Sequence, residues 1–295
     1  MLTIFTIPKA FHELNEIIQM NAIHSWLALD PRPERILLGK DEGTAEIASR
    51  LAVKHVAEIE CNEYGTPLVS SMFSIAQDIA SHPVMCYINA DIILLSDFIP
   101  AVRRVKEKTF LIVGQRTDLD IKEMIDFENS EWEISLRDLV KAKGKLHPPS
   151  GIDYFVFNRG LYRDILPFAI GRTAWDNWLV YQSRKLKASL IDATPAITAI
   201  HQNHDYSHHP QGESAVWKGP EAIRNKELLG GKDYSFDPQH ASLVLTPRGT
   251  KRALSMRRVY FQMRSIPALY PRFYFLLSVF KLLERLILNF RQKQT

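Results

Sequence analysis

The sequence contains little cysteine. Cys61 and Cys86 are its only two cysteines in 295 residues, and they do not form a CxxC pair. This spacing gives neither a disulfide framework nor a cysteine-based zinc site. We therefore expect a protein of a reducing compartment, in which both thiols serve in packing.

A secretory leader is also missing. The apolar run that starts at Leu2 has no basic residues before it, and Pro8 and Lys9 interrupt it early. We interpret this run as a first β-strand and expect a cytoplasmic protein.

Acidic residues are scarce near the end of the chain. From Arg248 to Thr295 there are eleven lysines and arginines but a single acid, Glu284, whereas the first 247 residues hold 26 basic and 32 acidic residues. A mildly acidic body therefore carries a strongly basic tail, which indicates an anionic partner for the tail. Elsewhere the composition, 46% hydrophobic and 24% charged, is that of a globular chain with a substantial core.

Predicted strands and helices alternate along the chain. Short β-branched apolar runs are separated by segments whose apolar residues recur at helical spacing. The expected strands are 2–7, 35–38, 55–59, 84–90, 110–113, 152–157 and 197–200, and the expected helices are 10–29, 44–54, 68–81, 132–143 and 175–187. Alternation of this kind predicts an α/β fold with a mostly parallel sheet.

The strongest chemical signal is the tripeptide Asn89-Ala90-Asp91. It follows a nearly continuous apolar strand, and open α/β sheets bind their ligands at the carboxyl ends of such strands. A carboxylate there can hold a divalent cation that neutralises a diphosphate. A lone Asn-x-Asp more often caps a loop. Here, however, its position after a buried strand favours a ligand site.

Features farther along the chain occur in a fixed order. They are Ser150-Gly151 with Phe155–Asn158, Pro167–Gly171, Trp175-Asp176 at a helix start, and a strand that ends at His201. Together with Asn89-Ala90-Asp91 they resemble the GT-A-fold nucleotide-diphospho-sugar glycosyltransferases, in particular the family-two-like members. The resemblance runs from Leu2 to Asp205.

The resemblance implies a fold, an activity and a cofactor. The fold would be a GT-A-like, Rossmann-type sandwich, and the reaction would move a sugar from a nucleoside-diphosphate donor to an acceptor hydroxyl. Asp91 would hold Mg²⁺ or Mn²⁺. Asn89 stands where the family has its first Asp, and the missing charge would weaken that site.

The resemblance also assigns the catalytic base to Asp176, because Trp175 occupies the place of the family's Glu. A carboxylate that opens a helix below the acceptor can take the proton of the attacking hydroxyl. The alternative is an Asp that only favours the helix dipole. Asp153 is the second catalytic candidate.

Four of the ten histidines lie between His201 and His209. A hydrolytic zinc site is one interpretation, but the spacing matches no usual helical zinc pattern, and Pro210 and Gly212 predict a loop. Under the transferase interpretation, His201 and His204 complete the cation site with Asp91. His208 and His209 are not assigned.

Nucleotide contacts are expected over the ends of the first two strands. This places Thr6, Pro8 and Asp41 in the donor site, together with Asn89 and Asp91. Ordinary strand-end turns explain the first three residues equally well.

The tail combines positive charge with apolar residues. Between Phe273 and Phe290, thirteen of eighteen residues are apolar or aromatic, and the polar ones recur at helical spacing. Charges near its middle disfavour a membrane span, so we expect residues 248–295 to lie on an anionic membrane surface. The alternative is a helix packed on the protein's own core. No nucleic-acid-binding motif is present, so a nucleic-acid partner is not expected.

The sequence therefore predicts a GT-A-like domain over residues 1–230, followed by a basic linker and apolar helix over 231–295. The expected protein is a hexosyltransferase of cell-surface, glycolipid or polysaccharide synthesis, peripheral on the inner membrane face. A sugar nucleotidyltransferase would need a glycine-rich loop after the first strand, and residues 4–11 contain no glycine. A catalytically weak nucleotide-sugar-binding or scaffolding module stays open because of Asn89.

Overall fold

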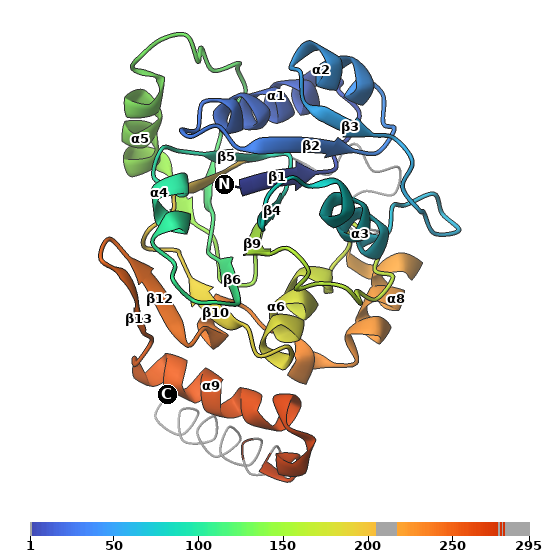
Figure 1. The fold of residues 1–295 in the computed structure, drawn as a ribbon, viewed down its shortest axis with the longest axis vertical. Coiled ribbons are helices and arrows are strands. Elements are labelled where there is room, and N and C mark those ends of the chain that lie inside the picture. Colours follow the sequence, from blue (N-terminus) through green and yellow to red (C-terminus); the bar gives the residue numbers. More distant parts are fainter. Residues whose placement is uncertain (1, 205–216, 277, 279, 281–295) are drawn as a thin grey trace, which may run out of the picture.

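The computed structural model describes residues 2–204, 217–276, 278 and 280 (Figure 1). The strands are β1 (Leu2–Thr6), β2 (Glu34–Leu38), β3 (Lys54–Val56), β4 (Val84–Ile88), β5 (Ile92–Leu94), β6 (Phe110–Val113), β7 (Thr117–Leu119), β8 (Lys145–Leu146), β9 (Tyr154–Asn158), β10 (Ser189–Asp192), β11 (Ala199–Gln202), β12 (Leu243–Thr246) and β13 (Gly249–Arg252). The α-helices are α1 (Glu13–Leu27), α2 (Thr44–Arg50), α3 (Val69–Ile79), α4 (Phe98–Arg103), α5 (Trp132–Lys143), α6 (Trp175–Lys185), α8 (Pro220–Leu229) and α9 (Met256–Leu269).

A nine-stranded sheet forms the centre of the molecule, in the order β13-β12-β10-β6-β9-β4-β1-β2-β3. Its pairs are parallel except for those that β9 makes with β4 and β6 and the hairpin of β12 with β13. This confirms the predicted α/β fold with a mostly parallel sheet.

Helices cover both faces of this sheet. Alternate strand residues point to opposite faces, so Ile4 packs with α1, α2 and α4, whereas its neighbour Phe5 packs with α3 and α6. On the second face, the rings of Phe5, Phe73 and Phe157 lie 5.1–6.3 Å apart in edge-on and stacked pairs. Such pairs contribute about 0.5–1.5 kcal/mol each beyond their burial. Tyr87 of β4 is part of this cluster, which fixes its ring beneath the strand end.

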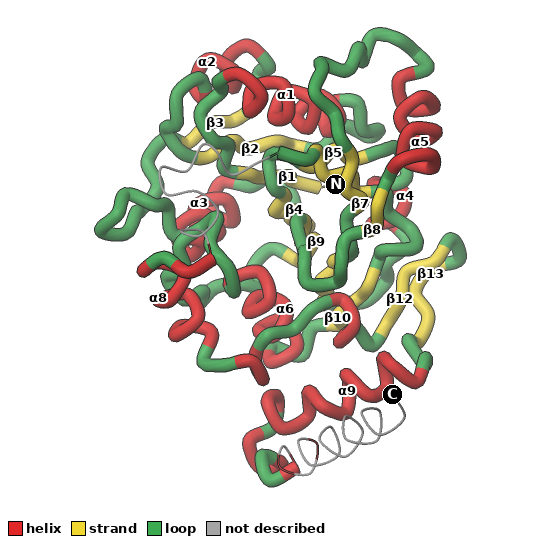
Figure 2. Tube along the Cα trace, turned by 180° about the vertical axis from the view of Figure 1, so that it is seen from behind, coloured by secondary structure: helices red, strands yellow, loops and turns green. Residues whose placement is uncertain are grey.

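A second, smaller sheet has the strand order β5-β11-β7-β8, and Figure 2 shows its strands β7 and β8 side by side near α5. Buried Ile93, Leu119 and Ile200 pack this sheet against Leu136 of α5. The helix over 132–143 was predicted, but the strands β7 and β8 on either side of it were not. Strands β7 and β8 are too short to show a hydrophobic period, which is why the sequence did not reveal them.

The segment after Gly230 returns to the main sheet. β12 pairs in parallel with β10, and β13 closes the hairpin at the edge. Helix α9 then packs below this edge, and Arg258 forms an ion pair with Asp192 at the end of β10. The division at residue 230 stays a prediction, but the residues that follow it include two strands of the sheet.

None of the helices in residues 2–204 and 217–276 is both long and apolar enough to cross a membrane.

Candidate active site

Asp91 lies in the short connection between β4 and β5. Strand β11 runs antiparallel to β5 and places His201 opposite Ile92, the residue after Asp91. The backbone carbonyl of Asp91 accepts hydrogen bonds from the main-chain N–H and the side-chain amide of Gln202, at 3.3 and 3.2 Å. The strand end that carries the carboxylate is thereby joined to the strand that carries the histidine.

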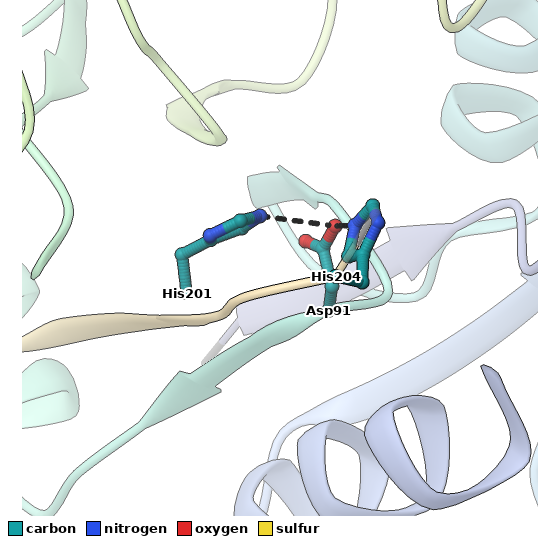
Figure 3. A group of neighbouring side chains, drawn as sticks. All are labelled: Asp91, His201 and His204. Atoms are coloured by element: carbon teal, nitrogen blue, oxygen red, sulfur yellow. Dashed lines mark hydrogen bonds and ion pairs between the residues drawn. The ribbon is translucent and has the colours of Figure 1, made fainter. Parts of the chain in front are cut away.

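Asp91, His201 and His204 form one cluster (Figure 3). Oδ2 of Asp91 lies 3.1 Å from Nε2 of His204 and 3.6 Å from Nε2 of His201, and one donor atom from each residue lies within 4.8 Å of the others. The sequence predicted these three residues as the cation ligands, and the fold brings them together.

The donor set fits a divalent transition metal. Oδ1 of Asp91 is buried and has no hydrogen-bond partner among the described residues, so a ligating oxygen is available. Burial alone would raise the pKa of Asp91, but the nearby His201 and His204 outweigh it and hold that pKa well below its usual range. Two imidazoles and one carboxylate suit Mn²⁺ better than Mg²⁺, which prefers oxygen ligands only.

Asn89 does not face this cluster. Its Oδ1 accepts a hydrogen bond from the Tyr87 hydroxyl at 2.9 Å, and its Nδ2 donates to Oδ1 of Asp153 at 2.6 Å. Both polar atoms of the amide therefore bond to residues other than Asp91. The expectation that Asn89 stands in the cation site is not supported by these contacts.

Asp153 is held at both of its oxygens. In addition to the bond from Asn89, Oδ2 accepts a hydrogen bond from Nη1 of Arg116 at 2.7 Å, and the Asp153 side chain is 8% exposed. Both oxygens of Asp153 are therefore already engaged by neighbouring side chains. Of the two predicted catalytic residues, the geometry favours Asp176.

Asp176 lies in the first turn of α6, at the helix end that faces the sheet. The indole of Trp175 anchors this end, packing edge-on against Tyr87 with ring centres 5.4 Å apart. Oδ1 of Asp176 is buried without a partner among the described residues. Burial, with a further contribution from the charge of Asp153, raises the pKa of Asp176 to about 7. A carboxylate with a pKa near neutrality is suited to general-base work.

Comparison with solved structures identifies the fold. The S. aureus TarS fragment 1–349, in complex with UDP-GlcNAc, superposes with a TM-score of 0.53 and 12% identity over 93% of this chain and 73% of that one. The chain has the GT-A fold. GalNAc-T7 with UDP, GalNAc and Mn²⁺ gives a TM-score of 0.46 and 15% identity over 76% of this chain and 47% of that one. No protein-family model matches the sequence, and no curated protein is similar to it.

The predicted donor residues lie at the expected strand ends of this GT-A domain, with unequal access. Thr6 is fully buried at the end of β1, so it has no surface to offer a ligand, and Pro8 is buried as well. Asp41 is exposed after β2, where Gly39 turns the chain at a φ of 92°. Of the three, Asp41 alone is accessible to a nucleotide.

The sequence analysis missed two cations beside the cluster of the GT-A domain. Lys9 follows β1, and Arg172 precedes α6. Burial is the main cause that lowers the pKa of Lys9; Asp91 raises it and Arg172 lowers it further, so Lys9 lies within electrostatic reach of both charges. Arg172 also forms a 2.6 Å ion pair with Glu221 of α8. Nothing in the local sequence marks either residue, because the fold alone brings Lys9 near both Asp91 and Arg172.

Two further features of the sequence, the unassigned His208 and His209 and the apolar tail, lie wholly or mostly outside the described residues. His208 and His209 lie between residues 205 and 216, and most of the apolar segment Phe273–Phe290 lies beyond residue 276.

Proposed function

We propose that this protein is a glycosyltransferase that transfers a sugar from a nucleoside-diphosphate donor to an acceptor hydroxyl. The main support is that a GT-A fold holds both the Asp91-His201-His204 cluster and Asp176, whose pKa is raised to about 7. TarS, the solved structure with a TM-score of 0.53, holds UDP-GlcNAc, which supports a uridine diphosphate sugar as the donor.

Asp91, His201 and His204 would hold the divalent cation, with Mn²⁺ preferred over Mg²⁺. When bound, such an ion neutralises the diphosphate and stabilises it as a leaving group. The positive charge of Lys9 near Asp91, with Arg172 near Lys9, supports binding of the same phosphates.

Asp176 would act as the base. Its buried Oδ1 is available to accept the proton of the acceptor hydroxyl as that oxygen attacks the anomeric carbon. The Asn89 contacts bear on the rival interpretation as a binding or scaffolding module. That interpretation relied on a cation site weakened by Asn89, yet the side chain of Asn89 is bonded to Tyr87 and Asp153 instead.

The finer parts of the proposal are a hexose donor and an acceptor of cell-surface, glycolipid or polysaccharide synthesis, reached from the inner membrane face. The hexose is supported by the UDP-GlcNAc of the TarS structure, and the membrane location by the surface of α9 and its flanks. Seven of the fourteen large hydrophobic side chains exposed in the described part of the chain lie between Leu254 and Phe275. Lys251, Arg252 and Arg257 are exposed beside them, and the sequence has no acid between Asp237 and Glu284. A basic and apolar surface of this kind suits an anionic bilayer.

A donor screen tests the activity. We expect one or more UDP-sugars to raise the melting temperature in the presence of Mn²⁺ and to be hydrolysed slowly without acceptor, with both effects lost in Asp91→Ala. A broad panel of sugar nucleotides that neither binds nor turns over, with or without Mn²⁺, would overturn the proposal. Binding that ignores Mn²⁺, without turnover, would favour the binding module.

A further inference from the structure

Four titratable side chains follow one another across the small sheet. Asp91 directly precedes β5, His201 is on β11, Asp118 is on β7 and His147 directly follows β8. The strand order β5-β11-β7-β8 therefore sets them in a row. In the parallel ladder of β11 and β7, His201 is the register partner of Asp118.

Asp118 contacts the edge of the His201 ring that lies away from Asp91. Oδ1 of Asp118 lies 3.2 Å from Nδ1 of His201, while Nε2 of the same ring lies 3.6 Å from Asp91. The imidazole is therefore flanked by a carboxylate at each nitrogen. The Nδ1 contact has hydrogen-bond length but not hydrogen-bond alignment in this structure.

Two other side chains hold the Asp118 carboxylate in place. Nε of Arg116 donates to Oδ1 at 2.9 Å, and Nδ1 of His147 lies 2.6 Å from Oδ2. Arg116 is itself fixed by its bond to Asp153, and the backbone N–H of His147 donates to the carbonyl of Arg116 at 2.9 Å. Asp118 is 22% exposed at its side chain, so these contacts are partly shielded from water.

A neutral imidazole that binds a cation through one nitrogen carries its proton on the other. A carboxylate that accepts this proton fixes the tautomer and the ring orientation, and makes the ligating nitrogen more basic. We infer that Asp118 is a positioning residue, which orients His201 so that Nε2 is directed at the cation. The inference rests on the proposed function, because it requires that the Asp91-His201-His204 cluster binds a divalent metal.

The test is metal binding by the full chain, measured by titration calorimetry with Mn²⁺ and by the visible absorption spectrum of bound Co²⁺. Loss of such a supporting carboxylate costs about 10- to 100-fold in metal affinity, so Asp118→Asn should bind Mn²⁺ at least about tenfold more weakly. Its Co²⁺ spectrum should also shift, since the His201 ligand changes orientation. Asp138→Asn, which removes a 67% exposed carboxylate of α5, is the matched control and should bind as wild type does.

A second variant keeps the test valid if Asp118→Asn misfolds. His147→Gln alters a half-buried side chain that supports Asp118 without touching His201, and its Mn²⁺ affinity should fall between wild type and Asp118→Asn. If both variants bind Mn²⁺ with wild-type affinity and give the wild-type Co²⁺ spectrum, Asp118 has no positioning role. If wild type itself binds neither metal, or binds them unchanged after His201→Ala, the proposed metal site fails, and that outcome is distinct from the first.

Discussion

The negative charge of Asp153 raises the pKa of Asp176 and adds to the larger effect of burial. Arg116 holds Asp153 at one side of this pair, while Asp176 keeps a buried oxygen without a partner among the described residues. One carboxylate is therefore fixed in a salt bridge, and the other is tuned toward neutrality. Asp153 thus has a structural role, and Asp176 is the candidate base.

The first prediction concerns the pH dependence of transfer. A base must be deprotonated to act, and the pKa of Asp176 is raised to about 7, so kcat/KM should fall as pH drops below 7. In Asp153→Asn the neighbouring charge is gone, and the midpoint of this limb should move to lower pH. The measurement is a pH–rate profile of both proteins at a saturating cation concentration. If the acid limb of the Asp153→Asn profile keeps the wild-type midpoint, the charge of Asp153 does not raise the pKa of Asp176.

The same pKa predicts a stability effect. The unfolded chain loses the Asp176 proton near the ordinary value of 3.8, whereas the folded chain keeps it until about 7. Between these values the folded state binds the extra proton, so stability falls as pH rises, and the penalty is complete above pH 7. Asp176→Asn should therefore have a free energy of unfolding at most about 4 kcal/mol above that of wild type at pH 8 and close to wild type at pH 4. Thermal or urea unfolding at the two pH values measures this difference. Equal gains at both pH values would point to a cause other than this titration.

A third prediction addresses the cation. Asp91→Asn removes the charged ligand of the cluster, so Mn²⁺ binding and Mn²⁺-dependent donor hydrolysis should both be lost. In wild type treated with a chelator, Mn²⁺ should restore activity at lower concentration than Mg²⁺, because two of the three ligands are imidazoles. Titration calorimetry and donor hydrolysis measure both points, and Mg²⁺ restoring activity at the lower concentration would argue against ligation by the histidines.

A fourth prediction concerns the Arg116–Asp153 salt bridge. Its side chains are 17% and 8% exposed, so Arg116→Ala leaves a nearly buried carboxylate without its cation. Such a loss costs about 3–5 kcal/mol. Lys141→Ala breaks an exposed ion pair with Asp138 and should cost under about 1 kcal/mol. Urea unfolding of the two variants gives the comparison, and similar losses would show that Asp153 is stabilised by other groups.

The fifth prediction tests the basic surface near α9. Replacing Lys251, Arg252 and Arg257 by Glu should abolish flotation with anionic vesicles and leave the neutral-vesicle result unchanged. A triple Glu variant at Lys122, Lys141 and Lys143, exposed basic residues elsewhere, serves as control. Flotation of both variants at the wild-type level would rule out docking through this surface. Point variants are preferable to a shortened chain, since β13 belongs to the sheet.

The sequence was sufficient for those parts of the molecule whose signal is local. The apolar strand before Asp91 and the helix that begins at Trp175 can be recognised from periodicity and composition, and both occur, each ending two residues earlier than predicted. The grouping of His201 and His204 with Asp91 followed from the resemblance to GT-A-fold proteins and agrees with the geometry.

The remainder of the site depends on contacts between distant residues. Asp118 meets His201 only because β7, a three-residue strand, pairs with β11 more than eighty residues later. Asn89 was placed beside the cation through the resemblance, because it stands where the family has its first Asp, but the chain leaves the strand at Ile88, and Asn89 turns toward Asp153. A motif position does not fix where a side chain points after a strand has ended.

The position of β13 has a consequence for handling the protein. As the last strand of the nine-stranded sheet it covers the open hydrogen-bonding edge of β12, and it carries the exposed charges of Lys251 and Arg252. Charged residues on an edge strand oppose pairing with a second molecule. Deletion from Gly249 onward would expose the backbone of Leu243–Thr246 as a template for intermolecular β-pairing, so that aggregation, rather than loss of any ligand, would be the first effect of trimming the chain there.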